Sequence, residues 1–372
     1  MLWLPILLLL AGLVLLVGGA EIFVRGAARL AAMLGVSPLV IGLTVVAFGT
    51  SAPEIAVSVQ AGAAGQADIA IGNVVGSNIA NILLVLGISA AIAPLVVSHQ
   101  LVRLDVPIMI FVSVLFLAFG YDGEISRLEG GILFGMAIAY TLLLLWLSRR
   151  HRASLDAEEF DREFGNAPPR VPSQWFRQGA MVVGGGLLLV WGSNWLVDGA
   201  VAVARSFGVS ELVIGLTIIA VGTSLPEAAT SVVASLRGER DIAVGNLVGS
   251  NIFNILVVIG VSSLVVPGGG LSVSSAALGF DIPVMLAVAL ACLPIFANDH
   301  RIHRWEGWMF FGYYLAYAFY LLLDSADHDA LPLYSRVMEV FVLPLTGITL
   351  LVVSGQAVRS WLQRRRAGPG TG

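Results

Sequence analysis

Long apolar runs follow one another along almost the whole chain, separated by short polar connectors. Each run is close to the roughly 20 residues that a helix needs to cross a bilayer. The runs lie near residues 3–20, 38–62, 69–93, 105–120 and 129–148, then near 178–197, 211–235, 242–265, 281–297 and 304–323, and finally near 336–358. This pattern predicts an all-α polytopic membrane protein with 11 spans, grouped as five, five and one.

The second group of five spans repeats the first at an offset of 173 residues. Between Ile41–Gly87 and Ile214–Gly260, 30 of 47 positions are identical without a gap, and the identities concentrate in polar segments. A unit with an odd number of spans must cross the membrane in the opposite direction when it is repeated. Inverted repeats of this kind are a recurring design of secondary transporters, which bind their substrate near the midplane where the repeats meet.

The stretches outside the repeated spans complete the predicted organisation. Residues 149–175 are charged and rich in proline, as is typical of a loop in water. The first 20 residues lack the positively charged start of a signal peptide, so we expect them to form the first span. The expected segments are a five-helix repeat (1–148), a cytoplasmic loop (149–175), an inverted five-helix repeat (176–325), and an extra transmembrane helix with a basic cytoplasmic tail (326–372).

The composition and the placement of charge agree with a membrane protein. Of the 372 residues, 58% are hydrophobic and only 12% are charged, whereas soluble domains carry about 25% charged residues. Basic residues gather in the connectors on one side, at Arg25 and Arg29, His99 and Arg103, Arg149, Arg150 and Arg152, Arg237 and Arg240, Arg301 and Arg304, and Arg364, Arg365 and Arg366. The positive-inside rule then places the N-terminus outside and the C-terminus in the cytoplasm.

Two glutamates lie in the middle of apolar runs, where a carboxylate is costly and usually functional. The hexapeptides GTSAPE (49–54) and GTSLPE (222–227) place Glu54 and Glu227 at equivalent positions of the two repeats. A buried, protonated glutamate that only bonds a neighbour is the structural alternative. The matched pair, with matched neighbours, argues against that alternative.

Hydroxyl groups and freed carbonyls accompany each glutamate. The residues three and four positions before each glutamate carry hydroxyls and share its helix face; they are Thr50, Ser51, Thr223 and Ser224. The proline before each glutamate leaves the carbonyl four residues back, at Gly49 or Gly222, without a helical donor. Unpaired backbone at this depth must be satisfied by a neighbouring helix, water or an ion. We interpret these carbonyls as candidate cation ligands, with a simple packing kink as the alternative.

The third and eighth spans supply further polar side chains at matched positions. They are Asn73, Ser77, Asn78 and Asn81 in the first repeat, and Asn246, Ser250, Asn251 and Asn254 in the second. Ser77 and Asn81 are four residues apart, so both can point at one place. Asn73 and Asn78 fit equally well as hydrogen-bonding groups between helices, and the glycines at 72, 76, 245 and 249 favour close helix packing.

All these candidate ligands are oxygen atoms. Oxygen ligands favour hard cations such as Ca²⁺ and Na⁺, whereas Zn²⁺ and copper favour imidazole and thiolate. The single cysteine, Cys292, lies in an apolar run and is expected only to pack. The sequence shows no nucleotide-binding glycine motif and no soluble domain that could be an ATPase or another enzyme. We expect transport driven by an ion gradient, with the bilayer and the transported ions as partners, without a resident cofactor, nucleotide or nucleic acid.

The doubled GTSxPE motif and the twin GNxVGSN segments resemble the calcium/cation antiporter superfamily, specifically its prokaryotic sodium/calcium exchanger branch. The resemblance covers roughly residues 1–325 and implies two inverted five-helix repeats that bind cations between the second, third, seventh and eighth spans. It implies that Glu54 and Glu227 coordinate Ca²⁺ with the carbonyls of Thr50 and Thr223. It also implies a set of Na⁺ ligands, namely the two glutamates, Ser51, Ser224, Ser77, Ser250, and the carbonyls of Ala47 and Ala220.

Two positions bear on the type of exchanger that the chain resembles. Potassium-dependent exchangers place an aspartate at one of the third-span sites, whereas Asn81 and Asn254 are both neutral here. Proton/calcium exchangers carry asparagine where this chain has Thr50 and Thr223. These features favour Na⁺/Ca²⁺ antiport. The alternatives are antiport of H⁺ against Ca²⁺ or another divalent cation, with glutamate protonation replacing Na⁺ binding, and a cation channel with the paired glutamates as its filter.

Overall fold

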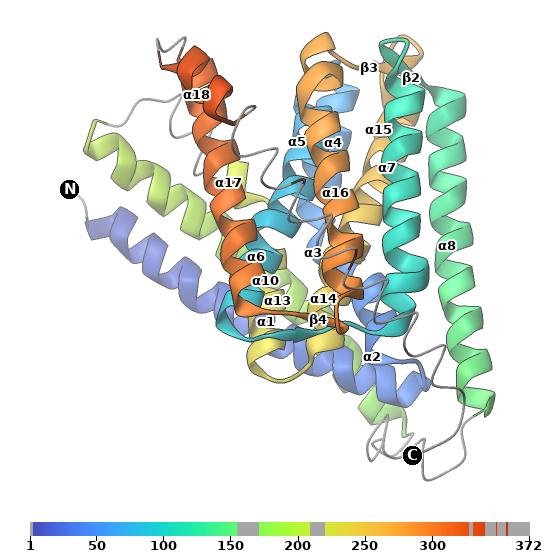
Figure 1. The fold of residues 1–372 in the computed structure, drawn as a ribbon. Coiled ribbons are helices and arrows are strands. Elements are labelled where there is room, and N and C mark those ends of the chain that lie inside the picture. The colour runs from blue at the N-terminus through green and yellow to red at the C-terminus, as the bar shows by residue number, and fades with distance from the viewer. Residues whose placement is uncertain are drawn as a thin grey trace.

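The computed structural model describes residues 3–154, 171–208, 220–326 and 330–338, together with the single residues 347 and 355. Within these ranges the chain is almost entirely helical (Figure 1). The expected eleventh span (336–358) lies almost wholly outside the described residues. So do most of the expected loop at 149–175 and the first part of the seventh span, residues 211–219.

The described elements follow the predicted division into two halves. The first half comprises α1 (Trp3–Leu34), α2 (Pro38–Ile41), the π-helix η1 (Gly42–Val46), α3 (Ala47–Thr50), α4 (Ala52–Ala63), α5 (Ala67–Ala80), η2 (Asn81–Leu86), α6 (Gly87–Ile92), β1 (Leu95–Val96), η3 (Leu101–Asp105), α7 (Val106–Gly120), β2 (Glu124–Ser126) and α8 (Arg127–Ser154). The second half comprises α10 (Pro172–Ser206), α12 (Ala220–Gly222), α13 (Leu225–Leu236), α14 (Arg240–Phe253), η5 (Asn254–Ile259), α15 (Gly260–Val265), β3 (Gly270–Ser272), η6 (Ala277–Asp281), α16 (Ile282–Ala297), β4 (Arg301–Ile302), α17 (Arg304–Ser325) and α18 (Leu331–Val337).

Seven helices of the described chain are long and apolar enough to cross a membrane, or eight if the bent pair Pro38–Thr50 and Ala52–Ala63 counts as one span. This makes the chain an integral membrane protein. Two helices are longer than predicted, because α1 runs to Leu34 and α10 begins at Pro172. The expected tenth span corresponds to α17, which is a helix of 22 residues. Its tryptophan and tyrosine residues make α17 less apolar than the seven helices counted above.

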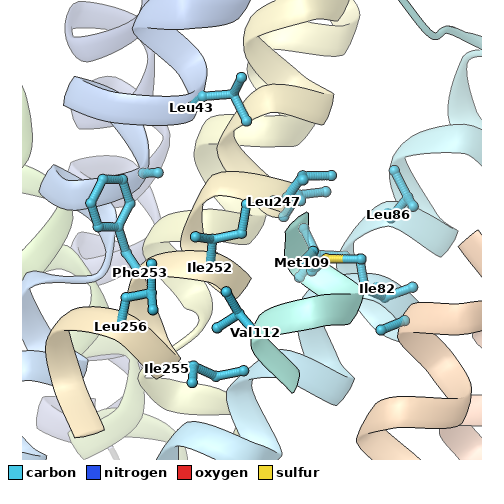
Figure 2. Close-up of a cluster of buried hydrophobic side chains, with 14 of the residues drawn as sticks. Leu43, Ile82, Leu86, Met109, Val112, Leu247, Ile252, Phe253, Ile255 and Leu256 are labelled. Atoms are coloured by element: carbon cyan, nitrogen blue, oxygen red, sulfur yellow. The ribbon is translucent and has the colours of Figure 1, made fainter. Parts of the chain in front are cut away.

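The repeated polar spans form the centre of the molecule. The apolar window of the continuous segment Arg240–Val265 is 100% buried and that of Ala67–Ile92 is 72% buried, whereas the windows of α1, α8 and α10 are at most 28% buried. Leucine, isoleucine and phenylalanine side chains of α14 and η5 pack against η1, η2 and α7 in one core (Figure 2). The outer helices instead expose large apolar side chains such as Val14, Leu142 and Leu187, as expected of surfaces that face lipid. The polar side chains of the central spans are therefore held away from lipid by a ring of apolar helices.

The two long helices α1 and α10 lie side by side, oblique to the upright α7, α8 and α16 (Figure 1). Their backbones touch at glycines spaced seven residues apart, Gly12 and Gly19 on α1 and Gly185 and Gly192 on α10. Gly12 lies opposite Gly192, and Gly19 lies opposite Gly185. The two helices therefore run antiparallel, and only glycine allows this close approach.

Elements of the two halves are paired reciprocally. Strand β1 pairs antiparallel with β4, and β2 pairs antiparallel with β3. The last long helix of each half crosses the third span of the other half at a glycine pair, Gly130 with Gly260 and Gly307 with Gly87. Neither the short strands nor these reciprocal helix contacts were predicted from the apolar pattern. The contacts accompany the packing of the polar spans of both halves against each other at the centre.

Candidate cation-binding site

Each GTSxPE segment lies at a break between two helices. Helix α3 ends at Thr50 and α4 begins at Ala52, and the helical segments Pro38–Thr50 and Ala52–Ala63 differ in direction by 48°. Ser51 at the break has φ −79° and ψ 9°, and Ser224 has the nearly identical φ −84° and ψ 5°. The helix is therefore interrupted within each motif, and the expectation that the hydroxyls and the glutamate share one face stays a prediction. The proline lies in the first turn of the second helix, where no backbone donor is required.

The two glutamates occupy the first turns of α4 and α13, and both are buried. Glu54 is 1% exposed and Glu227 is 0% exposed. A helix N-terminus favours negative charge because its first N–H groups have no partner within the helix. Ser51 donates a hydrogen bond to Oε1 of Glu227 at 3.0 Å, so a hydroxyl of the first half contacts the carboxylate of the second.

Buried oxygen atoms without a donor gather at equivalent positions of the two halves. Within the described chain, the buried polar atoms without a hydrogen bond of good geometry include both carboxylate oxygens of Glu54, Oε2 of Glu227, the hydroxyls of Ser77, Ser224 and Ser250, and Oδ1 of Asn81 and Asn254. The hydroxyls of Ser77 and Thr223 still lie close enough to interact with Glu54, and those of Thr50 and Ser250 with Glu227. Each buried unsatisfied polar group costs about 1–3 kcal/mol. A bound cation would satisfy many such oxygens at once, so these residues fit a hard cation as cargo.

Four asparagines tie the third span of one half to that of the other. Asn78 donates through Nδ2 to the backbone oxygen of Asn251, and Asn251 donates back to the backbone oxygen of Asn78, both at 3.2 Å. Asn81 donates to Oδ1 of Asn251 at 3.1 Å, and Asn254 donates to Oδ1 of Asn78 at 3.0 Å. Because the amide nitrogens of Asn81 and Asn254 are used in this network, their Oδ1 atoms stay available as acceptors.

The two threonines of the motifs also contact the opposite half. Thr50 donates through Oγ1 to Oδ1 of Asn246 at 3.0 Å, and Thr223 donates to Oδ1 of Asn73 at 3.4 Å. Asn73 and Asn246 are thus hydrogen-bonding groups between helices, a role that the sequence had left open for Asn73. The sequence showed that these asparagines and threonines occupy matched positions in the two repeats. It did not predict that each asparagine would bond to the motif threonine of the opposite half.

One of the freed backbone carbonyls has a donor on a neighbouring helix. The carbonyl of Gly222 accepts a hydrogen bond of 2.7 Å from the hydroxyl of Ser193 on α10. Because a carbonyl oxygen has two lone pairs, its interpretation as a cation ligand stays a prediction. The backbone candidates Ala47 and Ala220 begin the short helices α3 and α12 directly before the breaks.

Nitrogen and sulfur ligands do not gather in the described part of the chain, which contains no group of three or more His, Cys, Asp or Glu arranged to hold a metal. Cys292 is buried, and its thiol contacts only the Val288 carbonyl among the hydrogen bonds described. The ring centroids of His99 and His300 lie 4.0 Å apart, with the ring planes tilted by 59°, beside the β1–β4 pair and outside the polar central helices. The central site therefore offers oxygen ligands with two acidic groups.

Comparison with known proteins gives consistent matches over most of the chain. The family profile described as "Sodium/calcium exchanger protein" matches residues 4–146 and 178–323. The inner membrane protein YrbG of Escherichia coli is 39% identical over 286 residues, which cover 76% of this chain and 86% of YrbG. The sodium/calcium exchanger MaX1 of Methanosarcina acetivorans is 36% identical over 340 residues, covering 84% and 96% of the two chains. A solved structure of the sodium-calcium exchanger NCX_Mj superposes with a TM-score of 0.71 at 32% identity, covering 85% of this chain and 97% of that one.

Proposed function

This chain belongs to the sodium/calcium exchanger protein family, and we propose that it is a secondary antiporter that exchanges Na⁺ for Ca²⁺ by alternating access. The family consists of transporters rather than enzymes. The observation that carries the proposal is the set of buried oxygens without donors, which come from matched positions of both halves and include two carboxylates. Such a set is costly in a membrane protein unless a cation is its partner.

In the proposed site, Glu54 and Glu227 coordinate Ca²⁺ together with the carbonyls of Thr50 and Thr223. Na⁺ uses the same glutamates with Ser51, Ser77, Ser224, Ser250 and the carbonyls of Ala47 and Ala220, and Asn81 and Asn254 complete the oxygen set. Two carboxylates balance the charge of one Ca²⁺ or of two Na⁺. Because the ions share the glutamates, binding of one ion displaces the other, which is the coupling that antiport requires.

The proposed architecture is two inverted five-helix repeats and an eleventh span. The antiparallel packing of α1 on α10 and the reciprocal pairs β1–β4 and β2–β3 support the inversion. Each half contributes one glutamate at the start of a helix, so the two half-sites face each other across the centre. Helices that break beside each glutamate can reorient on either side of the bound ion.

The test of the proposed function is Ca²⁺ flux in proteoliposomes that contain the purified protein. We expect an outward Na⁺ gradient to drive uptake of radioactive Ca²⁺, because Na⁺ leaving the vesicle empties the shared glutamates for Ca²⁺. A pH gradient without Na⁺ should drive little uptake. Ca²⁺ uptake that depends on the pH gradient and is independent of the Na⁺ gradient would instead support H⁺/Ca²⁺ exchange. Ca²⁺ flux that persists without either counter-gradient would support a channel.

The proposed orientation is N-terminus outside and C-terminus in the cytoplasm, in a prokaryotic inner membrane. The printed name of YrbG describes an inner membrane protein, and the basic connectors support this orientation. A fluorescent protein fused at the C-terminus of the full chain should fluoresce, because it folds in the cytoplasm. An alkaline phosphatase fused at the same place should be inactive, and the opposite pattern would reverse the orientation.

A further inference from the structure

Two chains of directed hydrogen bonds lead away from the motif threonines, one in each half. In the first, Thr50 donates to Oδ1 of Asn246 at 3.0 Å, Nδ2 of Asn246 donates to Oγ of Ser231 at 3.0 Å, and Ser231 donates to the Ala243 carbonyl at 3.4 Å. Thr50, Asn246 and Ser231 are each 0% exposed. Three consecutive side chains in the protein interior are thus linked from the motif to a backbone oxygen.

The second chain has the same order and the same direction. Thr223 donates to Oδ1 of Asn73 at 3.4 Å, Nδ2 of Asn73 donates to Oγ of Ser58 at 2.9 Å, and Ser58 donates to the Ala70 carbonyl at 3.5 Å. In both chains the threonine belongs to one half of the protein and the remaining groups belong to the other. The arrangement therefore occurs twice, at matched positions.

The carbonyl at the end of each chain fixes its direction. A carbonyl can only accept, so the serine hydroxyl, which has one hydrogen, donates to it. The serine oxygen must then accept from the asparagine amide nitrogen, and the amide oxygen must face the threonine. In the opposite orientation, Asn246 would turn its N–H groups toward Thr50. The single hydrogen of the Ser231 hydroxyl would then face two acceptors, Asn246 Oδ1 and the Ala243 carbonyl, and its oxygen would receive no hydrogen bond.

The direction of the hydrogen bonds in this chain decides which acceptor receives the single hydrogen of the Thr50 hydroxyl. Besides Asn246, the Ala47 carbonyl lies within reach of Thr50 Oγ1, at 3.4 Å, and the Glu227 carboxylate is close enough to interact with the same hydroxyl. The bond to Asn246 is the shorter of the two measured bonds, at 3.0 Å. The Ala47 carbonyl already accepts the backbone N–H of Ser51 at 3.0 Å, and a carbonyl oxygen has two lone pairs. A hydrogen bond from Thr50 would occupy the second lone pair. Since Asn246 takes the hydrogen, this lone pair of Ala47 stays free.

We propose that Asn246 is a positioning residue that orients the Thr50 hydroxyl away from the Ala47 carbonyl and so keeps this backbone oxygen available to Na⁺. The inference rests on the proposed function, in which the Ala47 carbonyl is a Na⁺ ligand. Asn246 itself does not touch the ion.

The first test is the Asn246→Ala variant, assayed for exchange and for ion binding. Binding is read as the rise in unfolding temperature of the purified protein with added Na⁺ or Ca²⁺, which requires no transport. We expect the half-saturating Na⁺ concentration to rise about tenfold, as expected for the loss of one ligand interaction worth about one hydrogen bond. The half-saturating Ca²⁺ concentration should change by less than about twofold, because the proposed Ca²⁺ ligands are unchanged. Equal shifts for both ions would overturn the proposal.

A double variant tests the route of the effect. Thr50→Val removes the hydroxyl hydrogen but keeps the backbone carbonyl of residue 50. In Thr50→Val/Asn246→Ala no hydrogen is left to occupy the Ala47 carbonyl, so most of the lost Na⁺ affinity should return. Additive losses of affinity in the double variant would refute the mechanism, since independent sites add and coupled ones do not.

Ser231→Ala gives a test in case Asn246→Ala does not fold. It removes the acceptor that fixes the amide orientation, and we expect a smaller rise of the half-saturating Na⁺ concentration, about threefold, without a Ca²⁺ shift. Ser235→Ala is the matched control, because Ser235 is buried one turn further along α13 and lies outside the chain of hydrogen bonds. Equal Na⁺ shifts in Ser231→Ala and Ser235→Ala would contradict the proposal. If wild-type protein shows no Na⁺-driven flux, the proposed function fails, and the Na⁺ binding curves alone still decide this inference.

Discussion

Replacing Glu54 or Glu227 with glutamine is expected to abolish Ca²⁺ exchange. Glutamine keeps the shape of the side chain and removes the charge, so the remaining site holds one carboxylate against a divalent cation. Loss of one partner of a buried charge pair typically costs 2–5 kcal/mol. Because 1.4 kcal/mol corresponds to a factor of ten, the apparent Ca²⁺ affinity should fall by about 100-fold or more.

Two measurements separate a lost site from a lost fold. In the absence of ions, the glutamine variants should unfold at a temperature no lower than the wild type, because an uncompensated buried carboxylate is itself destabilising. Added Ca²⁺ should raise the unfolding temperature of the wild type and leave that of the variants unchanged. Glu124→Gln is the matched control, since Glu124 is an exposed residue at the start of β2, opposite Ser272 of β3. Wild-type flux in either Glu54→Gln or Glu227→Gln would refute the proposed site.

Replacing Gly192 with valine is expected to prevent normal folding. A Cβ atom at this position would lie 2.5 Å from the backbone nitrogen of Leu16 and 2.9 Å from the carbonyl oxygen of Gly12. Both contacts are with backbone on the facing helix, so α1 and α10 would have to move apart along their length. Overpacking typically costs 1–3 kcal/mol even where side chains can yield. We expect a loss of at least about 3 kcal/mol in the free energy of unfolding for valine, and a smaller loss for alanine.

Gly184→Ala on the same helix is the control, and we expect it to change stability in the opposite direction from Gly192→Val. Within the described chain, a Cβ at Gly184 would meet nothing within 4 Å, and alanine favours a helix over glycine by about 1 kcal/mol. The unfolding temperature and the yield of monodisperse protein in detergent should therefore stay the same or rise for Gly184→Ala and fall for Gly192→Val. Similar behaviour of the two variants would show that the glycine contact between α1 and α10 does not limit stability.

Much of the candidate site could be predicted because its signals are local in the sequence. A carboxylate and a proline within an apolar run stand out by composition alone, and the offset of 173 residues duplicates them. Burial of Glu54, Glu227, Ser77 and Asn81 follows from the same local pattern. Helix ends were less predictable, since α1 continues to Leu34 through residues of mixed polarity.

Hydrogen-bond partners could not be predicted, because most of them lie on the other half of the chain. Ser51 bonds to Glu227 rather than to the adjacent Glu54, and the carbonyl of Gly222 accepts a hydrogen bond from Ser193 on α10. Spacing along a helix states which side chains share a face, but the helix is interrupted at Ser51 with a bend of 48°. The direction of a hydroxyl hydrogen also depends on an acceptor that only tertiary packing brings within reach.

The sequence by itself determined that the chain spans a membrane, that its two halves are related, and which oxygens lie deep in apolar segments. These features follow from the free energy of transferring each residue type from water, which depends on composition and local period. Only the tertiary structure decided which oxygens keep free lone pairs. That choice depends on how α5 and η2 dock against α14 and η5, because hydrogen bonds between asparagines, threonines and serines of opposite halves form only when those helices are in contact.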